Sequence, residues 1–342
     1  MGRRVLVTGG AGFIGSNLVD ALIARGDDVV VVDNLSVGRA ENLEQHADCP
    51  RFRLCVADVL DKRAMHELAA DRDVIFHLAT LCVRLSIFLD PEGVHRVNTE
   101  GTLNMLLAAA AARISRFVYV SSSETYGTAQ TVPMSEQHPF DPTTIYGASK
   151  LAGEHYSIAY HRTHGLPAVV VRPFNTYGPR AHFKGAYGEV IPKFVVRVIN
   201  GHPPIVFGDG LQTRDFTHVS DTVDGMIRAS EADRLIGSSV NIARGEEVTV
   251  NEIARLVLAA CGRDDLSPVH APDRPADHRR HYADISKARS TLGFAPAVGI
   301  EDGIRRYVAW FRATFPDPSR LIDDEQPYNW RPDDAGAPQV TR

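Results

Sequence analysis

A glycine-rich turn near the start of the chain places the tightest constraint on its fold. Residues 8–15 read Thr-Gly-Gly-Ala-Gly-Phe-Ile-Gly, follow a β-branched strand at Val5–Val7 and open an apolar-periodic helix at Ile14–Ala24. Glycines at this place allow a tight turn and a close backbone approach, and the helix N-terminus offers N–H groups and the positive end of its dipole. This order of strand, turn and helix predicts a βαβ unit that binds the pyrophosphate of a dinucleotide.

An acid at the end of the next strand indicates which dinucleotide. Asp33 follows the strand Val29–Val32 and lies 18 residues past Gly15. A carboxylate there accepts hydrogen bonds from both ribose hydroxyls and repels a 2′-phosphate, so NAD is favoured, while Arg39 keeps NADP as an alternative. The cofactor-binding residues predicted from this pattern are Gly9, Gly12, Phe13, Ile14, Gly15, Asp33 and Asn34, with Asp58 and Val59 as candidates for the adenine; a surface acid is the alternative for Asp58.

The strand–helix alternation continues to about residue 175 and predicts an α/β chain. Such an order builds a Rossmann-type, doubly wound parallel sheet, here over residues 1–175. Beyond it, short strands (Pro204–Phe207 and Ser239–Ile242) and isolated helices predict a smaller mixed α/β substrate lobe over 176–316, able to exchange segments with the first domain, and a tail over 317–342. Further strands are predicted at Arg53–Val56, Val74–His77, Phe117–Val120 and Ala168–Val171, and helices at Lys62–Ala70, Glu100–Ala112, Tyr146–His161, Ile191–Asn200, Val250–Ala260 and Ile300–Thr314.

Composition excludes several classes of function. The net charge is −5, from 42 acidic and 37 basic residues, which leaves no basic excess for a nucleic acid. The four cysteines form no C-x-x-C pair, so we expect neither a disulfide nor a metal site. No run approaches the about 18 apolar residues of a membrane-spanning helix, and no signal peptide precedes the first strand. We therefore expect a cytoplasmic protein without a membrane partner.

A tyrosine and a lysine four residues apart form a second chemical pattern. Tyr146 and Lys150 share one helix face, and an ammonium beside a phenol, with a cationic nicotinamide, lowers the phenol pKa toward that of a usable base. The fifth predicted strand ends in Ser121-Ser-Ser-Glu124, at the carboxyl edge where such sheets bind ligands. A serine hydroxyl there can share a proton with Tyr146.

These motifs together resemble the extended short-chain dehydrogenase/reductases of the nucleotide-sugar epimerase, dehydratase and decarboxylase group. The likeness runs from about residue 3 to residue 312. It implies NAD as cofactor, a UDP-sugar as substrate and a homodimer formed through the helices Glu100–Ala112 and Tyr146–His161. The motifs that carry it are the glycine turn, Asp33-Asn-Leu35, Asp58-Val59, His77-Leu-Ala79, Asn98, Ser121–Gly127, Tyr146-x-x-x-Lys150, Arg172–Arg180 and Phe207–Phe216.

The resemblance also assigns roles to individual residues. Tyr146 is implied to be the catalytic base, Lys150 to hold the nicotinamide ribose, and Ser122 to take the Ser/Thr position of the triad. An arginine at 214 also makes independent sense, because its planar fork matches phosphate oxygens. Further implied contacts are Leu78, Ala79 and Phe174 with the cofactor, and Asn175, Phe207, Arg214, Arg274 and Asp277 with the sugar nucleotide. His77 is expected to be a hydrogen-bonded histidine at a strand end.

The reaction outcome depends on the step after oxidation of the sugar at C4. Ser122-Ser123-Glu124 resembles the Thr-Ser-Glu of sugar-acid decarboxylases, and an acid near C5 suits proton transfer there, so decarboxylation of UDP-glucuronate to a UDP-pentose ranks first. Two features favour a UDP-glucose or UDP-glucuronate 4-epimerase instead: the Tyr-Gly-Ala-Ser-Lys reading at 146–150, and the absence of a Ser-Pro-Ala-Ser-Pro run after Ala79.

Other outcomes stay open. A 4,6-dehydratase is a second alternative, although no Asp precedes Glu124 to supply its acid. Arg84 is either a ligand for a substrate carboxylate or a surface residue. An NAD-binding sensor is the alternative outside enzymes, because Rossmann-type domains can lose their chemistry. A ketoreductase of free carbonyls is less consistent with the lobe that carries Arg214.

Overall fold

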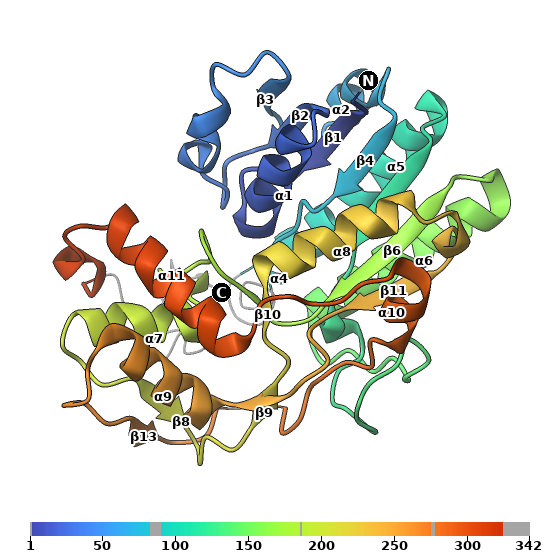
Figure 1. Cartoon of the computed structure of the whole chain (residues 1–342). Helices are drawn as coiled ribbons and strands as arrows, with labels where there is room; N and C mark the ends of the chain where they lie inside the picture. Colours follow the sequence, from blue (N-terminus) through green and yellow to red (C-terminus); the bar gives the residue numbers. More distant parts are fainter. Residues whose placement is uncertain (1, 83–89, 185–186, 275–277, 324–342) are drawn as a thin grey trace, which may run out of the picture.

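The computed structural model, which describes residues 2–82, 90–184, 187–274 and 278–323, is built on a seven-stranded parallel sheet (Figure 1). Its strands lie in the order β11-β6-β5-β4-β1-β2-β3, the doubly wound order with one strand added beyond β6. The Rossmann-type fold is confirmed. The strands are β1 (Arg4–Thr8), β2 (Asp28–Asp33), β3 (Phe52–Val56), β4 (Val74–His77), β5 (Arg116–Val120), β6 (Ala168–Pro173) and β11 (Ser239–Ile242).

Alternating side chains of the strands fill two cores, one on each face of the sheet. Val5 and Val7 of β1 pack with Leu18 of α1, whereas Leu6 packs on the opposite face with Met105 of α5. Both faces are therefore buried, as a parallel sheet requires. One face is covered by α1 (Phe13–Ala24) and α8 (Val219–Glu231), the other by α2 (Lys62–Ala69), α5 (Gly101–Ala112) and α6 (Ile145–His164).

A smaller lobe lies beyond the carboxyl ends of the strands and has its own core (Figure 1). Val195, Ile253 and Phe311 are fully buried where three helices pack against one another. Those helices are α7 (Val190–Ile199), α9 (Val250–Cys261) and α11 (Ile300–Thr314), beside the strand pairs β8 (Ile205–Phe207) with β13 (Val269–Ala271) and β9 (Thr213–Arg214) with β12 (Val248–Thr249).

Short elements connect these two parts. The pair β7 (Thr176–Tyr177) and β10 (Thr217–His218) lies between sheet and lobe. Helix α4 (Pro91–His95) packs against α6, and α10 (Ser286–Leu292) packs against β11 and α8. Short 3₁₀-helical segments occur at Ala40–His46, Ser123–Thr125, Asp233–Leu235 and Ser319–Leu321, and a π-helical segment at Arg96–Glu100 joins α4 to α5.

The structure differs from the sequence-based organisation beyond residue 175. The sequence assigns Ser239–Ile242 to the smaller lobe, but this segment forms β11 and pairs in parallel with Val170–Pro173 of β6. Helix α8 is absent from the sequence-based prediction, yet its apolar side chains cover the same sheet. Both differences have one reason: without β11 and α8, strand β6 would be an open edge with an uncovered face.

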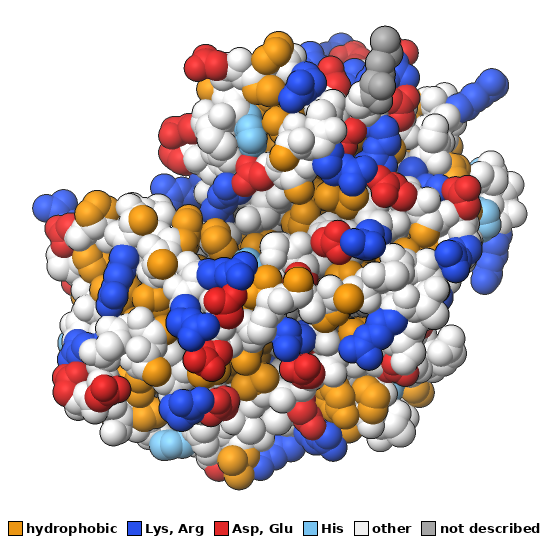
Figure 2. All heavy atoms as spheres, viewed as in Figure 1, with side chains coloured by type: hydrophobic (Ala, Val, Ile, Leu, Met, Phe, Trp, Pro, Cys, Tyr) orange, Lys and Arg blue, Asp and Glu red, His pale blue; other side chains and the backbone are white. Residues whose placement is uncertain are grey.

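No helix in the described parts of the chain is long and apolar enough to cross a membrane. On the face seen in Figure 2, basic and acidic side chains are interspersed rather than gathered in patches of one sign. The described residues also contain no group of three or more His, Cys, Asp or Glu side chains placed to hold a metal ion.

Candidate active site

A cavity of about 830 Å³ lies at the carboxyl ends of the central strands, where the smaller lobe faces the sheet. This volume is within the range of cofactor and substrate pockets. Its wall on the sheet side follows β1, β4, β5 and β6, and its opposite wall comes from the smaller lobe. Among the site residues predicted from the sequence, all those that the structure describes line this cavity; Asp277 and Arg84 lie outside the described residues.

The glycine turn forms a cradle that larger side chains would fill. Gly9 has a φ of +69°, and a Cβ added there would lie 2.7 Å from the backbone nitrogen of Ala79. A Cβ on Gly15 would lie 2.1 Å from the carbonyl oxygen of Gly9. Gly12 caps α1 without a side-chain hydrogen bond, so backbone and helix terminus face the cavity directly. This geometry fits a dinucleotide pyrophosphate.

Asp33 is fixed at the end of β2. Its Oδ2 accepts a hydrogen bond from the Ala11 nitrogen (3.0 Å), and its Oδ1 accepts one from the Leu35 nitrogen (2.9 Å). Burial raises the pKa of Asp33, and these two bonds oppose that effect. A carboxylate held on the cavity wall suits ribose hydroxyls.

Two other predicted cofactor contacts, Asn34 and Asp58, are hydrogen-bonded to each other, whereas Arg39, the residue that kept NADP as an alternative, pairs with another side chain. The Asn34 side chain donates to Asp58 Oδ2 (2.9 Å), and both residues line the cavity. The exposed side chain of Arg39 pairs with Glu41 at 3.5 Å. The residues at this end of the cavity therefore fit NAD.

His77 supports the cavity wall from behind. Its ring nitrogens contact the hydroxyls of Thr8 (2.7 Å) and Thr102 (3.0 Å), and Thr8 also accepts a hydrogen bond from the Ala79 nitrogen (3.2 Å). Burial lowers the pKa of His77 to about 3, so the ring is neutral at physiological pH. The prediction of a hydrogen-bonded strand-end histidine is confirmed, and Leu78 and Ala79 are thereby fixed beside the cradle.

Tyr146 and Lys150 lie in the first turns of α6, which begins at a Thr144 cap. The Lys150 Nζ donates to the Val120 carbonyl oxygen (2.8 Å) and lies 5.3 Å from the ring centre of Tyr119. Burial lowers the pKa of Lys150 to about 7. The same cause raises the pKa of Tyr146, and a hydrogen bond with the Ser122 side chain works against it. Tyr146, Lys150 and Ser122 thus line one cavity.

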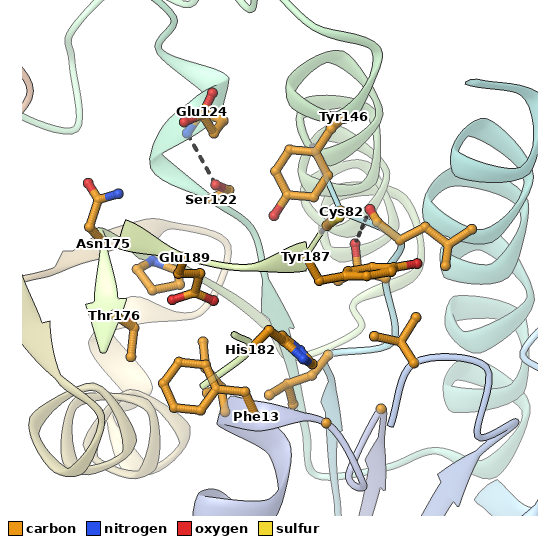
Figure 3. Close-up of a pocket in the computed structure, with 18 of the residues that line it drawn as sticks. Phe13, Cys82, Ser122, Glu124, Tyr146, Asn175, Thr176, His182, Tyr187 and Glu189 are labelled. Atoms are coloured by element: carbon orange, nitrogen blue, oxygen red, sulfur yellow. Dashed lines mark hydrogen bonds between the residues drawn. The ribbon is translucent and has the colours of Figure 1, made fainter. Parts of the chain in front are cut away.

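The segment after β5 supplies the remaining predicted groups. The hydroxyl of Ser122 accepts a hydrogen bond from the Glu124 nitrogen (3.2 Å), which turns the chain so that Ser122 and Glu124 border the same cavity (Figure 3). The Glu124 charge raises the pKa of Tyr146, so the carboxylate acts on the phenol. Ser123 also lines the cavity and is buried.

The smaller lobe contributes the predicted substrate residues. Arg214 Nη1 donates to the carbonyl oxygens of Thr213 (2.8 Å) and His278 (2.7 Å), which orients its guanidinium. Asn175 follows β6, and its buried Oδ1 has no hydrogen-bond partner within the described residues. The other predicted residues that border this part of the cavity are Phe174, Phe207 and Arg274.

Sequence reasoning missed a group of cavity residues between β7 and α7. His182, Tyr187 and Glu189 point into the cavity with Cys82 nearby (Figure 3). They follow the Arg172–Arg180 motif without any periodic pattern of their own. Their only signal is position, because the chain directly after the last strand of a doubly wound half leaves the sheet at its ligand-binding edge.

Comparison with known proteins agrees with this geometry. The family model described as GDP-mannose 4,6 dehydratase matches residues 6–307. The UDP-glucose 4-epimerase of Mycolicibacterium smegmatis is 39% identical over 90% of this chain and 98% of its own length. UDP-glucuronic acid decarboxylase 1 of Arabidopsis thaliana is 37% identical over 94% of this chain and 72% of its own.

A solved structure of the same kind carries the cofactor that the cradle fits. The dTDP-glucose 4,6-dehydratase DesIV of Streptomyces venezuelae, with NAD bound, is 33% identical, covers 92% of this chain and 98% of its own, and superposes with a TM-score of 0.85. Similar proteins are thus divided among three reactions. The matched sequence, the fold and the glycine cradle together show that this chain belongs to the extended short-chain dehydrogenase/reductase family of nucleotide-sugar epimerases, dehydratases and decarboxylases.

Proposed function

We propose that the protein oxidises C4 of a UDP-sugar to a ketone with NAD, and completes its reaction while the ketone stays bound. The observation that supports this most directly is the convergence of Tyr146, Lys150 and Ser122 beside the glycine cradle in one cavity. The lobe with Arg214 and Arg274 supports a nucleotide diphosphate as the handle of the substrate, because arginine pairs with phosphate oxygens through two parallel hydrogen bonds.

The chain's own residues account for the proton transfer. Tyr146 removes the proton of the C4 hydroxyl. Ser122, which forms a hydrogen bond with the Tyr146 phenol, orients the C4 hydroxyl toward it. Lys150, fixed by the Val120 carbonyl, lines the same cavity, where its amine can bind the hydroxyls of the cofactor ribose. When bound, NAD supplies a two-electron acceptor and a positive ring charge that favours the ionised phenol. The buried cavity wall keeps water from the ketone.

We propose 4-epimerisation as the outcome. An epimerase returns the electrons to the other face of C4 and needs no cation for a C6 carboxylate. The Tyr-Gly-Ala-Ser-Lys segment, which reads like that of an epimerase, supports this choice.

Decarboxylation of UDP-glucuronate is the second candidate, and Glu124 is the residue that favours it. An acid near C5 can transfer the proton that the enolate takes up after carbon dioxide leaves. In that case Glu124→Gln blocks carbon dioxide release more strongly than oxidation at C4, and reduced cofactor accumulates.

The test is incubation of the purified protein with UDP-glucose, UDP-galactose, UDP-glucuronate and their N-acetyl counterparts, followed by chromatography and mass spectrometry. Epimerisation gives a product of unchanged mass at a new retention time. Loss of carbon dioxide or of water identifies a decarboxylase or a dehydratase instead. The Tyr146→Phe variant is the control for turnover at this site. A wild-type protein that binds NAD yet leaves all these sugars unchanged contradicts the proposal and favours a sensor.

We also propose a homodimer formed through α5 and α6. Leu103 and Leu107 on α5 are 37% and 40% exposed, and Tyr156 on α6 is 39% exposed. Apolar side chains on two neighbouring helices suit a four-helix contact with a second copy. Sedimentation equilibrium of the wild type and of Leu107→Glu tests this, with a monomeric variant expected.

A further inference from the structure

A carboxylate on α1 receives hydrogen bonds from two segments that are far apart in the sequence. Asp20 Oδ1 accepts from the side chains of Gln45 (Nε2, 2.7 Å) and His46 (Nε2, 2.7 Å). Its Oδ2 accepts from Arg180 Nη2 at 2.6 Å. None of these four residues is among those that line the cavity. Asp20 therefore acts on the site only through the two segments that it holds.

The first segment continues from the cofactor end of the cavity. Residues of the stretch 33–38, Asp33 included, line the cavity wall. Directly after them the Asn42 side chain donates to the Ala11 carbonyl oxygen of the glycine turn (2.9 Å). Asn42 belongs to the 3₁₀-helical segment Ala40–His46, and Asp20 holds the last two residues of that segment. The wall at the cofactor end is thus fixed from behind against α1.

The second segment follows β7 and lies on the other side of α1. Asn17, three residues before Asp20, donates through Nδ2 to two carbonyl oxygens, those of Phe13 (2.9 Å) and Pro179 (3.1 Å). Phe13 belongs to the first turn of α1 and lines the cavity, as does His182, which follows Pro179 by three residues (Figure 3). One amide therefore joins the helix of the glycine cradle to the segment that leads to His182.

Arg180 holds a backbone conformation that needs support from outside its own segment. Its φ is +70°, in the left-handed region that residues with a side chain rarely adopt. The guanidinium is 19% exposed, and its Nη1 has no hydrogen-bond partner within the described residues. The bond from Nη2 to Asp20 therefore anchors both this side chain and the turn that carries it.

From these contacts we infer that Asp20 is a positioning residue for the cofactor: it holds both flanking segments against α1 and thereby slows the release of NAD. A segment that opens in part of the population lowers the apparent affinity for a ligand and gives that ligand a way out. Retention of NAD matters for any reaction that lends electrons to the cofactor and takes them back. The inference depends on the cofactor and not on which sugar is the substrate.

The experiment loads the protein with radiolabelled NAD, adds an excess of unlabelled NAD and follows the label that stays bound. Asp20→Ala should release NAD about tenfold faster than the wild type, the size expected for loss of hydrogen bonds to a charged group. Asp20→Glu keeps the charge and should stay within about threefold of the wild type. Asp224→Asn is the control, because Asp224 forms an ion pair with Arg228 on α8 (2.7 Å) and is not a cavity residue. Its release rate should equal that of the wild type.

Two measurements on nucleotide-free protein separate positioning from a general loss of stability. The Asp20 and Arg180 side chains are 34% and 19% exposed, and partly exposed pairs contribute little to folding. The midpoint of urea unfolding should therefore fall by no more than about 0.5 M in Asp20→Ala. Hydrogen exchange should become faster at the amides of Asn42 and Ala181, which are bonded within the two segments, and stay unchanged in β6.

A second variant tests the same contact without a change in α1. Arg180→Ala should speed NAD release less than Asp20→Ala does, because Asp20 still holds residues 45 and 46. The double variant should release NAD no faster than Asp20→Ala alone, since both changes break one contact. If Asp20→Ala does not fold, Arg180→Ala decides the matter by itself.

Release of NAD within about twofold of the wild type rate in both single variants overturns the inference, because the contacts would then not affect retention. Faster release that comes with hydrogen exchange raised throughout the sheet overturns it as well, since Asp20 would then serve the fold in general. Neither result bears on the proposed reaction, which is tested by turnover of the wild type.

Discussion

Replacing Lys150 with methionine should stabilise the folded protein while removing its activity. Lys150 is 3% exposed, and burial lowers its pKa from 10.5 to about 7. Between these values the unfolded chain holds a proton that the folded chain releases, so stability rises with pH through this window. At about 1.4 kcal/mol per pKa unit, a shift of this size means that keeping Lys150 charged costs about 5 kcal/mol more in the folded protein than in the unfolded chain.

The stability gain expected for Lys150→Met depends on pH, and this dependence shows that the gain comes from the burial of Lys150. Burying Lys150 costs the folded wild type about 4 kcal/mol at pH 7, and about 2 kcal/mol at pH 9, where the folded protein has given up the Lys150 proton. Lys150→Met removes this cost, but it leaves the Val120 carbonyl without its donor, at about 1–3 kcal/mol. We therefore expect a net gain of about 1–3 kcal/mol at pH 7 and little gain at pH 9. The change of about 2 kcal/mol between the two pH values does not depend on the lost hydrogen bond.

Urea unfolding followed by circular dichroism, on protein freed of nucleotide, measures this difference at both pH values. Lys62→Met is the control, because Lys62 is exposed on α2 and its replacement should change stability little at either pH. A stability difference between the wild type and Lys150→Met that is the same at pH 7 and pH 9 would refute the reasoning. So would a variant that is less stable than the wild type at pH 7.

Three more changes test other parts of the structure. Tyr146→Phe should lower turnover by about 10³-fold, within the range for loss of a general base, while NAD binding measured by calorimetry stays within about threefold. Gly15→Ala should weaken NAD binding at least tenfold, because the new Cβ would lie 2.1 Å from the Gly9 carbonyl oxygen; undiminished affinity would contradict the cradle. Glu154→Gln should lower the free energy of unfolding by about 3–5 kcal/mol, since it leaves Arg172 buried without its carboxylate; a loss below about 1 kcal/mol in urea unfolding would show that the pair is not needed.

The cofactor half of the cavity could be predicted from sequence because its geometry is local. The glycine turn needs a positive φ at Gly9 and close packing at Gly15, and both requirements are visible in the sequence as glycines in one short segment. The pair Tyr146 and Lys150 depends only on helical spacing. These motifs fix backbone shape within about ten residues, so no tertiary information is needed.

The substrate half could not be predicted in the same way. Glu189 reaches the cavity because α7 packs in the smaller lobe, and that packing depends on α9 and α11, far along the chain. The residues of Ser239–Ile242 predict a strand but not its partner, since pairing with β6 is a tertiary choice. Local propensity specifies an element, whereas burial of an open edge decides where it goes.

The placement of β11 also affects how the protein is made. Between Pro173, which ends β6, and Ser239, which starts β11, lie 65 residues. During synthesis the first six strands emerge from the ribosome well before the strand that closes their border, so the nascent sheet presents unpaired backbone groups throughout that interval. A truncated product ending near residue 175 would keep this border permanently, and we expect it to aggregate rather than to serve as an isolated nucleotide-binding module.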